Sequence, residues 1–197
     1  MIDLDKLLHI TRDTQPPKQG KVLISNPLLN DFFFRRSVVL LVDHGEDGSF
    51  GVILNKPLDL RLKDITESFA GLDLRVFLGG PVKSDGLFYL HRLGGVLPGS
   101  VAITKGLWWG GDTEILEQLM SDPTFALHHH VRFYLGYAGW VTGQLEEEMM
   151  NKSWVLSDIA PEEVTGEESS DLWIKKVKGL GRDFDPWLKF PADPSLN

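Results

Sequence analysis

Short apolar runs rich in Val, Ile and Phe recur along the chain from about residue 21 onward, and they are its dominant pattern. Runs of this length and composition predict β-strands. One of them, residues 38–42, contains no polar residue, which predicts a central strand covered on both faces. In the run 131–135, Arg132 and Tyr134 alternate with apolar neighbours, which predicts a half-exposed strand. The remaining runs are residues 22–24, 52–54, 76–78, 87–90 and 101–103.

Asp-Gly pairs stand beside several of these runs. Asp47 and Gly48 lie between two of them, and Asp85 and Gly86 precede another. Because Asp-Gly readily adopts the positive φ angles of tight turns, both pairs predict hairpins and therefore antiparallel pairing.

Apolar residues at helical spacing predict four helices. Asp112 or Thr113 is placed to cap the second helix and Thr142 the third, and Gly179 or Gly181 can close the last. Strands mixed with dispersed helices predict an α+β fold. The residues that share a helix face are Leu62, Ile65 and Phe69; Ile115, Leu116, Leu119 and Met120; Leu145 and Met149; and Trp173, Val177 and Leu180.

Length and composition predict one domain. The chain has 197 residues, of which 42% are hydrophobic and 24% charged, enough for a core and a hydrated surface. Residues 1–20 form a predicted extension, in which Leu4, Leu7 and Leu8 share helical spacing before a segment with two prolines and a glycine. We expect a single domain over residues 21–197.

Charge and cysteine content narrow the functional classes. The formal charge of -8 repels phosphate, so direct nucleic-acid binding is not expected. The absence of cysteine excludes disulfides, thiolate metal sites and a Cys nucleophile. There is neither a secretory signal pattern nor a run of about 20 apolar residues. We therefore expect a cytoplasmic protein with no membrane partner.

Charge is also distributed unevenly near the end of the chain. Residues 146–171 hold nine acids and one base, whereas residues 172–190 hold five bases and two acids. This asymmetry predicts that the last helix packs beside the acidic stretch through weak ion pairs.

Six separated segments resemble the YqgE/AlgH family in amino-acid sequence and in their order along the chain. They are GKVLISNPLL at 20–29, FRRSVVLLVDH at 34–44, FGVILNKPL at 50–58, VFLGGPV at 76–82, LFYLH at 87–91 and LGYAGWVTGQLEEEM at 135–149. The resemblance implies a strongly bent, mostly antiparallel, barrel-like sheet flanked by helices. Some family members carry a provisional label as transcriptional regulators, which implies no mechanism.

His44 lies two residues after the apolar run 38–42, at the end of the predicted strand. Asn55 directly follows the next run, 52–54. A histidine beside carboxylates can act as a general acid or base near neutral pH. The structural alternative is that His44 and Asn55 hydrogen-bond to loop backbone.

Gly79 and Gly80 follow a predicted strand. They can allow a ligand or a neighbouring backbone to approach closely, and their N–H groups can form an anion nest. The alternative is plain turn geometry, because no phosphate-loop motif surrounds them.

Tyr137 and Trp140 precede a predicted helix that carries Gln144, Glu147 and Glu148. Aromatic rings with convergent amide and carboxylate groups suit a small-ligand or peptide pocket. The alternative is that the rings pack the strand on the helix while the acids favour its N-terminal dipole.

Two further clusters are weaker candidates. His128 and His130 can face the same way in an extended chain, but two imidazoles make a poor metal site, and we expect a polar loop and no metal or cofactor. Trp108 and Trp109 are either core residues or an exposed patch for a protein partner. Hydrolase elbow and metalloprotease motifs are absent.

These observations favour a non-catalytic binding or regulatory module that engages a protein or small ligand around Tyr137, Trp140 and Gln144. The alternative is a small-molecule enzyme that uses His44 and Glu147 for proton transfer. Direct DNA binding is the least favoured function, because no helix-turn-helix pattern occurs and the charge has the wrong sign.

Overall fold

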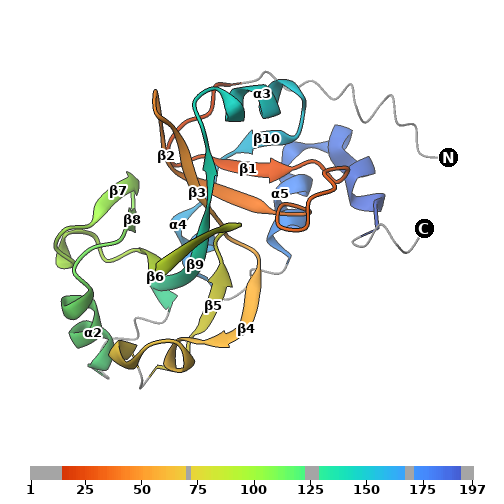
Figure 1. The fold of residues 1–197 in the computed structure, drawn as a ribbon. Coiled ribbons are helices and arrows are strands. Elements are labelled where there is room, and N and C mark those ends of the chain that lie inside the picture. The colour runs from red at the N-terminus through yellow and green to blue at the C-terminus, as the bar shows by residue number, and fades with distance from the viewer. Residues whose placement is uncertain (1–14, 70–71, 123–128, 167–170, 192–197) are drawn as a thin grey trace.

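The computed structural model describes residues 15–69, 72–122, 129–166 and 171–191, in which strands and short helices alternate (Figure 1). The strands are β1 (Val22–Ser25), β2 (Val38–Gly45), β3 (Gly48–Ile53), β4 (Pro57–Arg61), β5 (Arg75–Leu78), β6 (Val82–His91), β7 (Val101–Thr104), β8 (Leu107–Trp109), β9 (Val131–Trp140) and β10 (Trp154–Ser157). The α-helices are α2 (Thr113–Ser121), α3 (Gln144–Met150), α4 (Pro161–Thr165) and α5 (Leu172–Leu180). The 3-10 helices are η1 (Leu62–Asp64), η2 (Glu67–Phe69), η3 (Gly94–Val96) and η5 (Arg182–Lys189).

The strands form one bent sheet in the order β10-β1-β2-β3-β9-β6-β8-β7, which is not closed into a barrel. β5 joins it beside β9, and β4 pairs with β5. Every pairing is antiparallel except that of β5 with β9. The expected α+β fold with a bent, mostly antiparallel sheet and flanking helices is confirmed.

β2 is the central, doubly covered strand that its uninterrupted apolar run predicted. Val38, Leu40 and Val42 belong to one buried cluster, and Val39 and Leu41 to another on the opposite face. All five side chains are buried, which agrees with the alternation of side chains in a strand.

Helices cover both faces of the sheet. The inner face packs against α4, α5 and η5, and we call their shared core the inner cluster. The outer face is covered by α3 at one end and by α2, η1 and η2 at the other. In Figure 1, α3 lies at the top of the view and α2 at the lower left. Within the described ranges, no helix has the length and hydropathy to cross a bilayer.

The prediction of a half-exposed β9 is wrong, because Arg132 and Tyr134 are buried. The Arg132 guanidinium lies 4.4 Å from the centre of the Phe77 ring and donates to the Leu54 carbonyl at 3.2 Å and to the Gly166 carbonyl. These contacts replace the water that a buried cation loses. Burial raises the pKa of the Tyr134 phenol to about 12, although the nearby Arg132 cation opposes the rise.

Three local predictions are also wrong. The expected helix at Leu62–Phe69 is two short 3-10 turns, where the Thr66 hydroxyl accepts from the Ser68 N–H at 3.3 Å and so competes with helical bonding. Asp85 and Gly86 lie inside β6, at an irregularity in its pairing, and form no hairpin. The N-cap of α3 is Gly143, with φ of 79°, because the Thr142 hydroxyl donates to the Glu46 carbonyl instead.

Other local predictions are confirmed. Asp47 and Gly48 form the β2–β3 hairpin, and the Asp112 carboxylate caps α2 by accepting from the Ile115 N–H at 3.0 Å. Gly181 closes α5. α5 lies beside the acidic stretch, with Lys176 Nζ 2.7 Å from a Glu163 carboxylate oxygen.

The start of the domain remains a prediction. The helical face of Leu4, Leu7 and Leu8 lies outside the described residues. Gln19 and Gly20 already bond to β2, since the Gln19 amide donates to the Val42 carbonyl at 3.0 Å and the Gly20 N–H to the Leu41 carbonyl at 2.9 Å.

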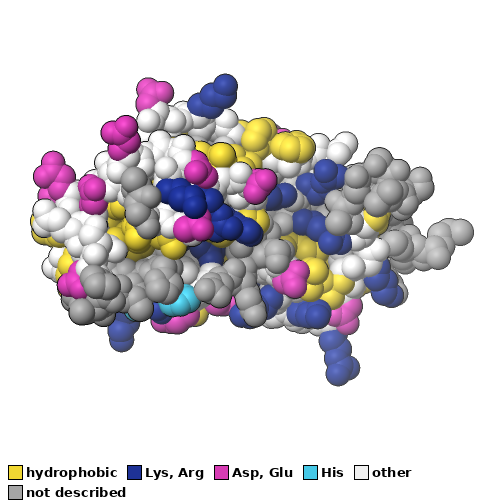
Figure 2. Space-filling model, turned by 90° about the horizontal axis from the view of Figure 1, so that it is seen from below, with side chains coloured by type: hydrophobic (Ala, Val, Ile, Leu, Met, Phe, Trp, Pro, Cys, Tyr) yellow, Lys and Arg dark blue, Asp and Glu magenta, His cyan; other side chains and the backbone are white. Residues whose placement is uncertain are grey.

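Figure 2 shows the molecule from below the view of Figure 1. On this face, Lys and Arg side chains are interspersed with Asp and Glu side chains and with hydrophobic patches. The described residues of this face therefore carry mixed charge, and among them Lys and Arg form no continuous surface of the kind that follows a phosphate backbone.

Candidate functional site

Gly79 and Gly80 lie where the chain crosses β9 at close range. The Gly79 N–H donates to the Leu135 carbonyl at 2.7 Å, and the Gly79 carbonyl accepts from the Ile53 N–H at 2.8 Å. A Cβ on Gly79 would meet the Gly136 carbonyl oxygen at 2.1 Å, and one on Gly80 would meet Tyr137 backbone at 2.2 Å. Close approach of a neighbouring backbone, one of the two predicted uses of these glycines, is therefore observed.

The same crossing decides where the β9 aromatics point. Gly136 has φ of 69°, and the pairing of β6 with β9 shifts on either side of it. Such a bulge changes which side chains share a face. As a result, Tyr137 shares the inner cluster with Tyr134, and the regular alternation that follows places Trp140 on the opposite face, in the cluster under α3. Tyr137 and Trp140 do not form the single surface predicted from sequence.

Trp140 and Gln144 do come together, around Glu148. One Glu148 carboxylate oxygen accepts from the indole N–H groups of Trp140 at 3.0 Å and Trp154 at 2.7 Å, and the other accepts from the Gln144 amide at 3.0 Å. The Gln144 carbonyl in turn accepts from the Val141 N–H at 3.1 Å. Trp140 is only 5% exposed, so this network secures the sheet to α3 and leaves its indole little contact with solvent.

His44 lies at the end of β2 beside Ser49, its antiparallel partner in β3. Its Nδ1 is 2.8 Å from the Ser49 hydroxyl, and its Nε2 is 3.6 Å from a carboxylate oxygen of Glu146. The carboxylate that the structure places beside His44 is that of Glu146, whereas Glu147, the predicted partner, is exposed on α3.

Asn55 has the structural role that the sequence left as an alternative. Its carbonyl accepts from the Val38 N–H at 2.9 Å, and its amide donates to the Arg36 carbonyl at 2.8 Å. Arg36 has a left-handed backbone, with φ of 49°. The Asn55 side chain thus holds an uncommon loop conformation in front of β2.

Tyr137 belongs instead to a group of four aromatic rings on the inner face. Phe50 lies 5.0 Å from Tyr137, 5.1 Å from Trp109 and 6.0 Å from Phe88 between ring centres. Phe88 stacks on Trp109 at 5.1 Å, with 29° between the ring planes. The four side chains come from four different strands, and each of them is partly exposed.

Two valines extend this group at its borders. Val82 is the cross-strand partner of Tyr137 and is 37% exposed, and Val101 is the partner of Trp109 and is 55% exposed. Cross-strand partners project from the same face of a sheet. We call the six residues Phe50, Val82, Phe88, Val101, Trp109 and Tyr137 the aromatic stripe. The stripe crosses the adjacent strands β3, β9, β6, β8 and β7, which at about 4.8 Å per step is roughly 20 Å.

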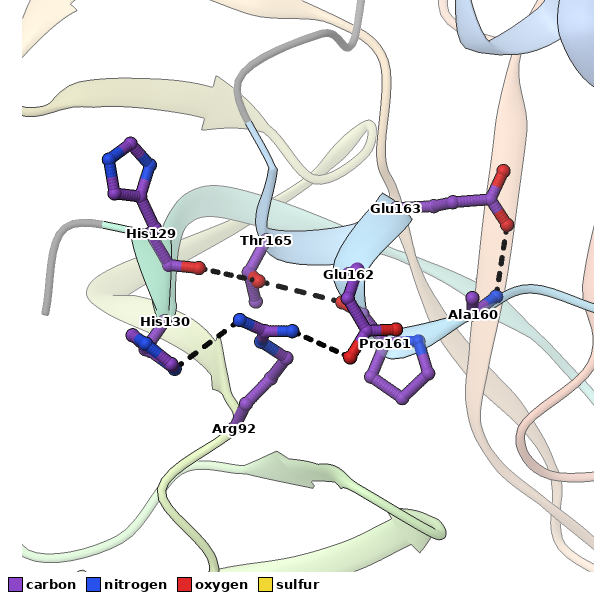
Figure 3. A network of polar contacts seen from close by, with 8 residues as sticks. All are labelled: Arg92, His129, His130, Ala160, Pro161, Glu162, Glu163 and Thr165. Atoms are coloured by element: carbon purple, nitrogen blue, oxygen red, sulfur yellow. Dashed lines mark hydrogen bonds and ion pairs between the residues drawn. The ribbon is translucent and has the colours of Figure 1, made fainter.

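A separate polar network holds α4 against β6 and β9 (Figure 3). Arg92 Nη1 is 2.7 Å from a Glu162 carboxylate oxygen, and Arg92 Nη2 is 3.4 Å from His130 Nδ1. The Thr165 hydroxyl donates to the His129 carbonyl at 2.9 Å. His128 lies outside the described residues. Among those that are described, no group of three or more His, Asp or Glu side chains is arranged to hold a metal ion.

The most deeply buried imidazole is that of His91, which is fully enclosed. The Leu93 N–H donates to its Nδ1 at 3.2 Å, so Nε2 carries the proton and donates to the Gly110 carbonyl at 2.9 Å. The Ser100 hydroxyl lies 2.9 Å from the same Nε2. A protonated Nε2 cannot accept the serine proton, so this Ser–His pair is not an activated nucleophile. Burial lowers the pKa of His91, although the bond to the Gly110 carbonyl opposes this effect.

Sequence reasoning missed most of these contacts. Phe88 lies in a predicted strand and Trp109 in the tryptophan pair, whereas Phe50 precedes a predicted strand. Only the strand order brings the three rings to Tyr137. Ser49 and Glu146 were missed as neighbours of His44. The available signal was the Asp-Gly turn, which makes His44 and Ser49 opposite residues of one hairpin.

The bent sheet, the helices on both its faces and the glycine crossing define an α+β protein with one mixed sheet. The chain belongs to the AlgH-like family, whose model matches residues 22–185. This confirms the resemblance carried by the six sequence segments.

Relatives and solved structures agree with this assignment. A UPF0301 protein of Bacteroides fragilis is 41% identical over 194 residues, 97% of each chain, and one of Parabacteroides distasonis is 37% identical over 199 residues, the full length of both. A crystal structure of a Corynebacterium diphtheriae protein has a TM-score of 0.75 at 24% identity and covers 94% of this chain and 98% of that one. The solution structure of the AlgH protein from Pseudomonas aeruginosa has a TM-score of 0.68 at 24% identity, with 87% and 94% covered. These two structures share the fold.

Proposed function

We propose that the protein is a non-catalytic binding module that engages a protein or small ligand through the aromatic stripe. The observation that carries the proposal is the mutual contact of Phe50, Phe88, Trp109 and Tyr137, each of which remains partly exposed. Rings that are packed on one side and open on the other supply large apolar contact area at little entropic cost.

The position of the stripe supports the same function. Its residues stand on β-strands, so the surface is already ordered before a ligand arrives. Its borders, Val82 and Val101, expose apolar side chains that gain from being covered. The stripe retains Tyr137 from the surface expected on sequence grounds. Rings of the inner face take the place of Trp140, which is enclosed, and of Gln144, which is half-buried.

The test introduces aspartate at the two exposed borders of the stripe. Val82→Asp and Val101→Asp are each compared with Val96→Asp, because Val96 is 60% exposed in η3 and lies outside the stripe. Each variant and the wild type are used for affinity capture from extract of the source bacterium, with mass spectrometry of proteins and metabolites. We expect both stripe variants to lose a ligand that Val96→Asp retains. Identical captures from all four proteins would refute the proposal.

A second candidate function is a small-molecule enzyme centred on His44. The observation that favours it is the contact of His44 Nδ1 with the Ser49 hydroxyl at 2.8 Å, with Glu146 on the opposite ring nitrogen. If Nε2–H is directed at Glu146, Nδ1 accepts the Ser49 proton as the oxygen attacks an acyl or phosphoryl centre, and returns that proton to the leaving group as the bond between this group and the centre breaks. Water then hydrolyses the Ser49 ester by the same steps.

A fluorophosphonate probe tests this second function directly, because it reacts with activated serines. The enzyme hypothesis predicts labelling of Ser49 that is lost in His44→Gln and retained in Glu147→Gln. Absence of label from Ser49 in the folded wild type would eliminate it.

A further inference from the structure

The β2–β3 hairpin places carboxylates at one end of the aromatic stripe. Asp43 is the cross-strand partner of Phe50, because the pairing shifts between Leu41 and Asp43 and brings the Asp43 side chain to the inner face. Asp43, Glu46 and Asp47 are all exposed. The last aromatic ring at this end therefore has an exposed carboxylate beside it and two more on the adjoining turn.

Helix α3 increases the negative charge at this end. The Thr142 hydroxyl donates to the Glu46 carbonyl at 3.0 Å, which fixes the start of α3 against the hairpin turn. Glu146 and Glu147 lie in the first turn of that helix. Residues 43–50 and 136–150 contain no Lys or Arg, so neither segment supplies a neutralising cation.

Resting on the proposed function of the stripe, we propose that its ligand is a segment of another protein in which apolar side chains stand next to Lys or Arg. Apolar side chains would cover the rings from Phe50 to Val101. A cation at one end would meet Asp43 and the face of the Phe50 ring, where ion pairing and cation–π attraction act together. The Glu46 and Asp47 carboxylates would attract further basic residues.

The dimensions of the stripe favour a protein segment over a metabolite. Its span of roughly 20 Å equals that of about six residues of extended chain at 3.3 Å per residue. Nucleic acid is disfavoured, since its phosphates would face the carboxylates of the hairpin. An acidic protein segment is disfavoured for the same reason.

Three synthetic ten-residue peptides serve as probes. One alternates Leu with Lys, the second alternates Leu with Glu, and the third alternates Ser with Lys. Affinities are measured by calorimetry at low and at physiological salt, and the contact site by amide chemical shifts. We expect the Leu/Lys peptide to bind at least about tenfold more tightly than either other peptide and to shift amides of β3, β6 and β8. Equal binding of the Leu/Glu peptide, or no binding of any peptide, would overturn the inference.

Charge variants test whether the carboxylates of the β2–β3 hairpin contribute to binding. The triple variant Asp43→Asn, Glu46→Gln, Asp47→Asn removes three exposed carboxylates from the hairpin. The control, Glu67→Gln, Glu114→Gln, Glu117→Gln, removes three carboxylates from η2 and α2, two of them on exposed residues and one on the half-buried Glu117. The hairpin variant is expected to lose about tenfold in affinity for the Leu/Lys peptide and most of the salt dependence, while the control binds as the wild type does.

The two proposals fail in different ways. If the hairpin variant and the control bind alike while Val101→Asp abolishes binding, the stripe remains a binding surface and the basic partner is refuted. If Val101→Asp and the hairpin triple variant both bind the Leu/Lys peptide as the wild type does, the stripe itself is refuted as the contact surface.

Discussion

The indole N–H of Trp140 donates to the carboxylate of Glu148 at 3.0 Å and joins the end of β9 to α3. The same carboxylate accepts from Trp154 of β10, so one acid satisfies two indoles beneath the helix. Removing it leaves donors without a partner in a mostly apolar setting.

Glu148→Ala is therefore expected to lower the free energy of unfolding by about 2–3 kcal/mol, measured by urea denaturation. Glu147→Ala is the matched control, because Glu147 is exposed on the same helix, and a change within about 0.5 kcal/mol is expected there. Similar losses in both variants would show that Glu148 has no special structural role.

Gly79→Ala should destabilise the fold by about 3 kcal/mol or more, because its Cβ would meet the Gly136 carbonyl oxygen at 2.1 Å. Neither strand can withdraw easily, since the Gly79 N–H also bonds to Leu135. Gly86→Ala is the control, because a Cβ there meets nothing within 4 Å. Thermal denaturation compares the two, and equal midpoints would contradict the close backbone crossing.

The buried His91 should make stability fall on acidification. Burial lowers the pKa of His91 in the folded state below the unfolded value of about 6.5, so the unfolded chain binds the proton more readily. The free energy of unfolding of the wild type should thus decrease more steeply between about pH 7 and pH 5 than that of His91→Gln. Parallel pH profiles for the two proteins would show that His91 does not contribute.

Glu163 should also make stability fall on acidification, at lower pH than His91. Burial would raise that pKa, but hydrogen bonds from Lys176 and from the Ala160 N–H, together with the Lys176 charge, lower it overall. Its contribution is present above the unfolded pKa of about 4.3 and is lost as pH falls through the lower folded value. Glu163→Gln should be less stable than the wild type at pH 7, and the difference should shrink toward pH 3. A difference that is independent of pH would contradict this account.

The elements that the sequence predicts well are those with strong local patterns. The run 38–42 indicates a doubly buried strand, and Asp112 before an amphipathic stretch indicates the start of α2. β8 and β10 have three and four residues, too few for a distinct period, and exist because β6 and β1 pair with them. β4 was not predicted because it begins with Pro57, and proline is rare within strands. A proline is nevertheless compatible with the first residue of an edge strand.

The site was harder to predict than the fold, because its geometry depends on local irregularities. The irregularity at Gly136 places Tyr137 on the same face as Tyr134. β9 then continues to Trp140, and its alternation puts Tyr137 and Trp140 on opposite faces, a relationship that the shorter predicted strand 131–135 hides. α3 begins at Gln144, and this start decides which glutamate faces His44. A helix capped at Thr142 would have placed the glutamates at different angles around the helix axis. The aromatic stripe depends on the order of five strands, of which only β7 and β8 are close in sequence.

The most direct test of the aromatic stripe as a binding surface is calorimetric titration of Val101→Asp and Val96→Asp with the Leu/Lys peptide. Val101 is 55% exposed at the border of the stripe and Val96 is 60% exposed outside it, so the substitutions are matched in chemistry and exposure. The account predicts that Val101→Asp weakens binding at least about tenfold relative to Val96→Asp. Equal affinities in two folded variants would contradict it.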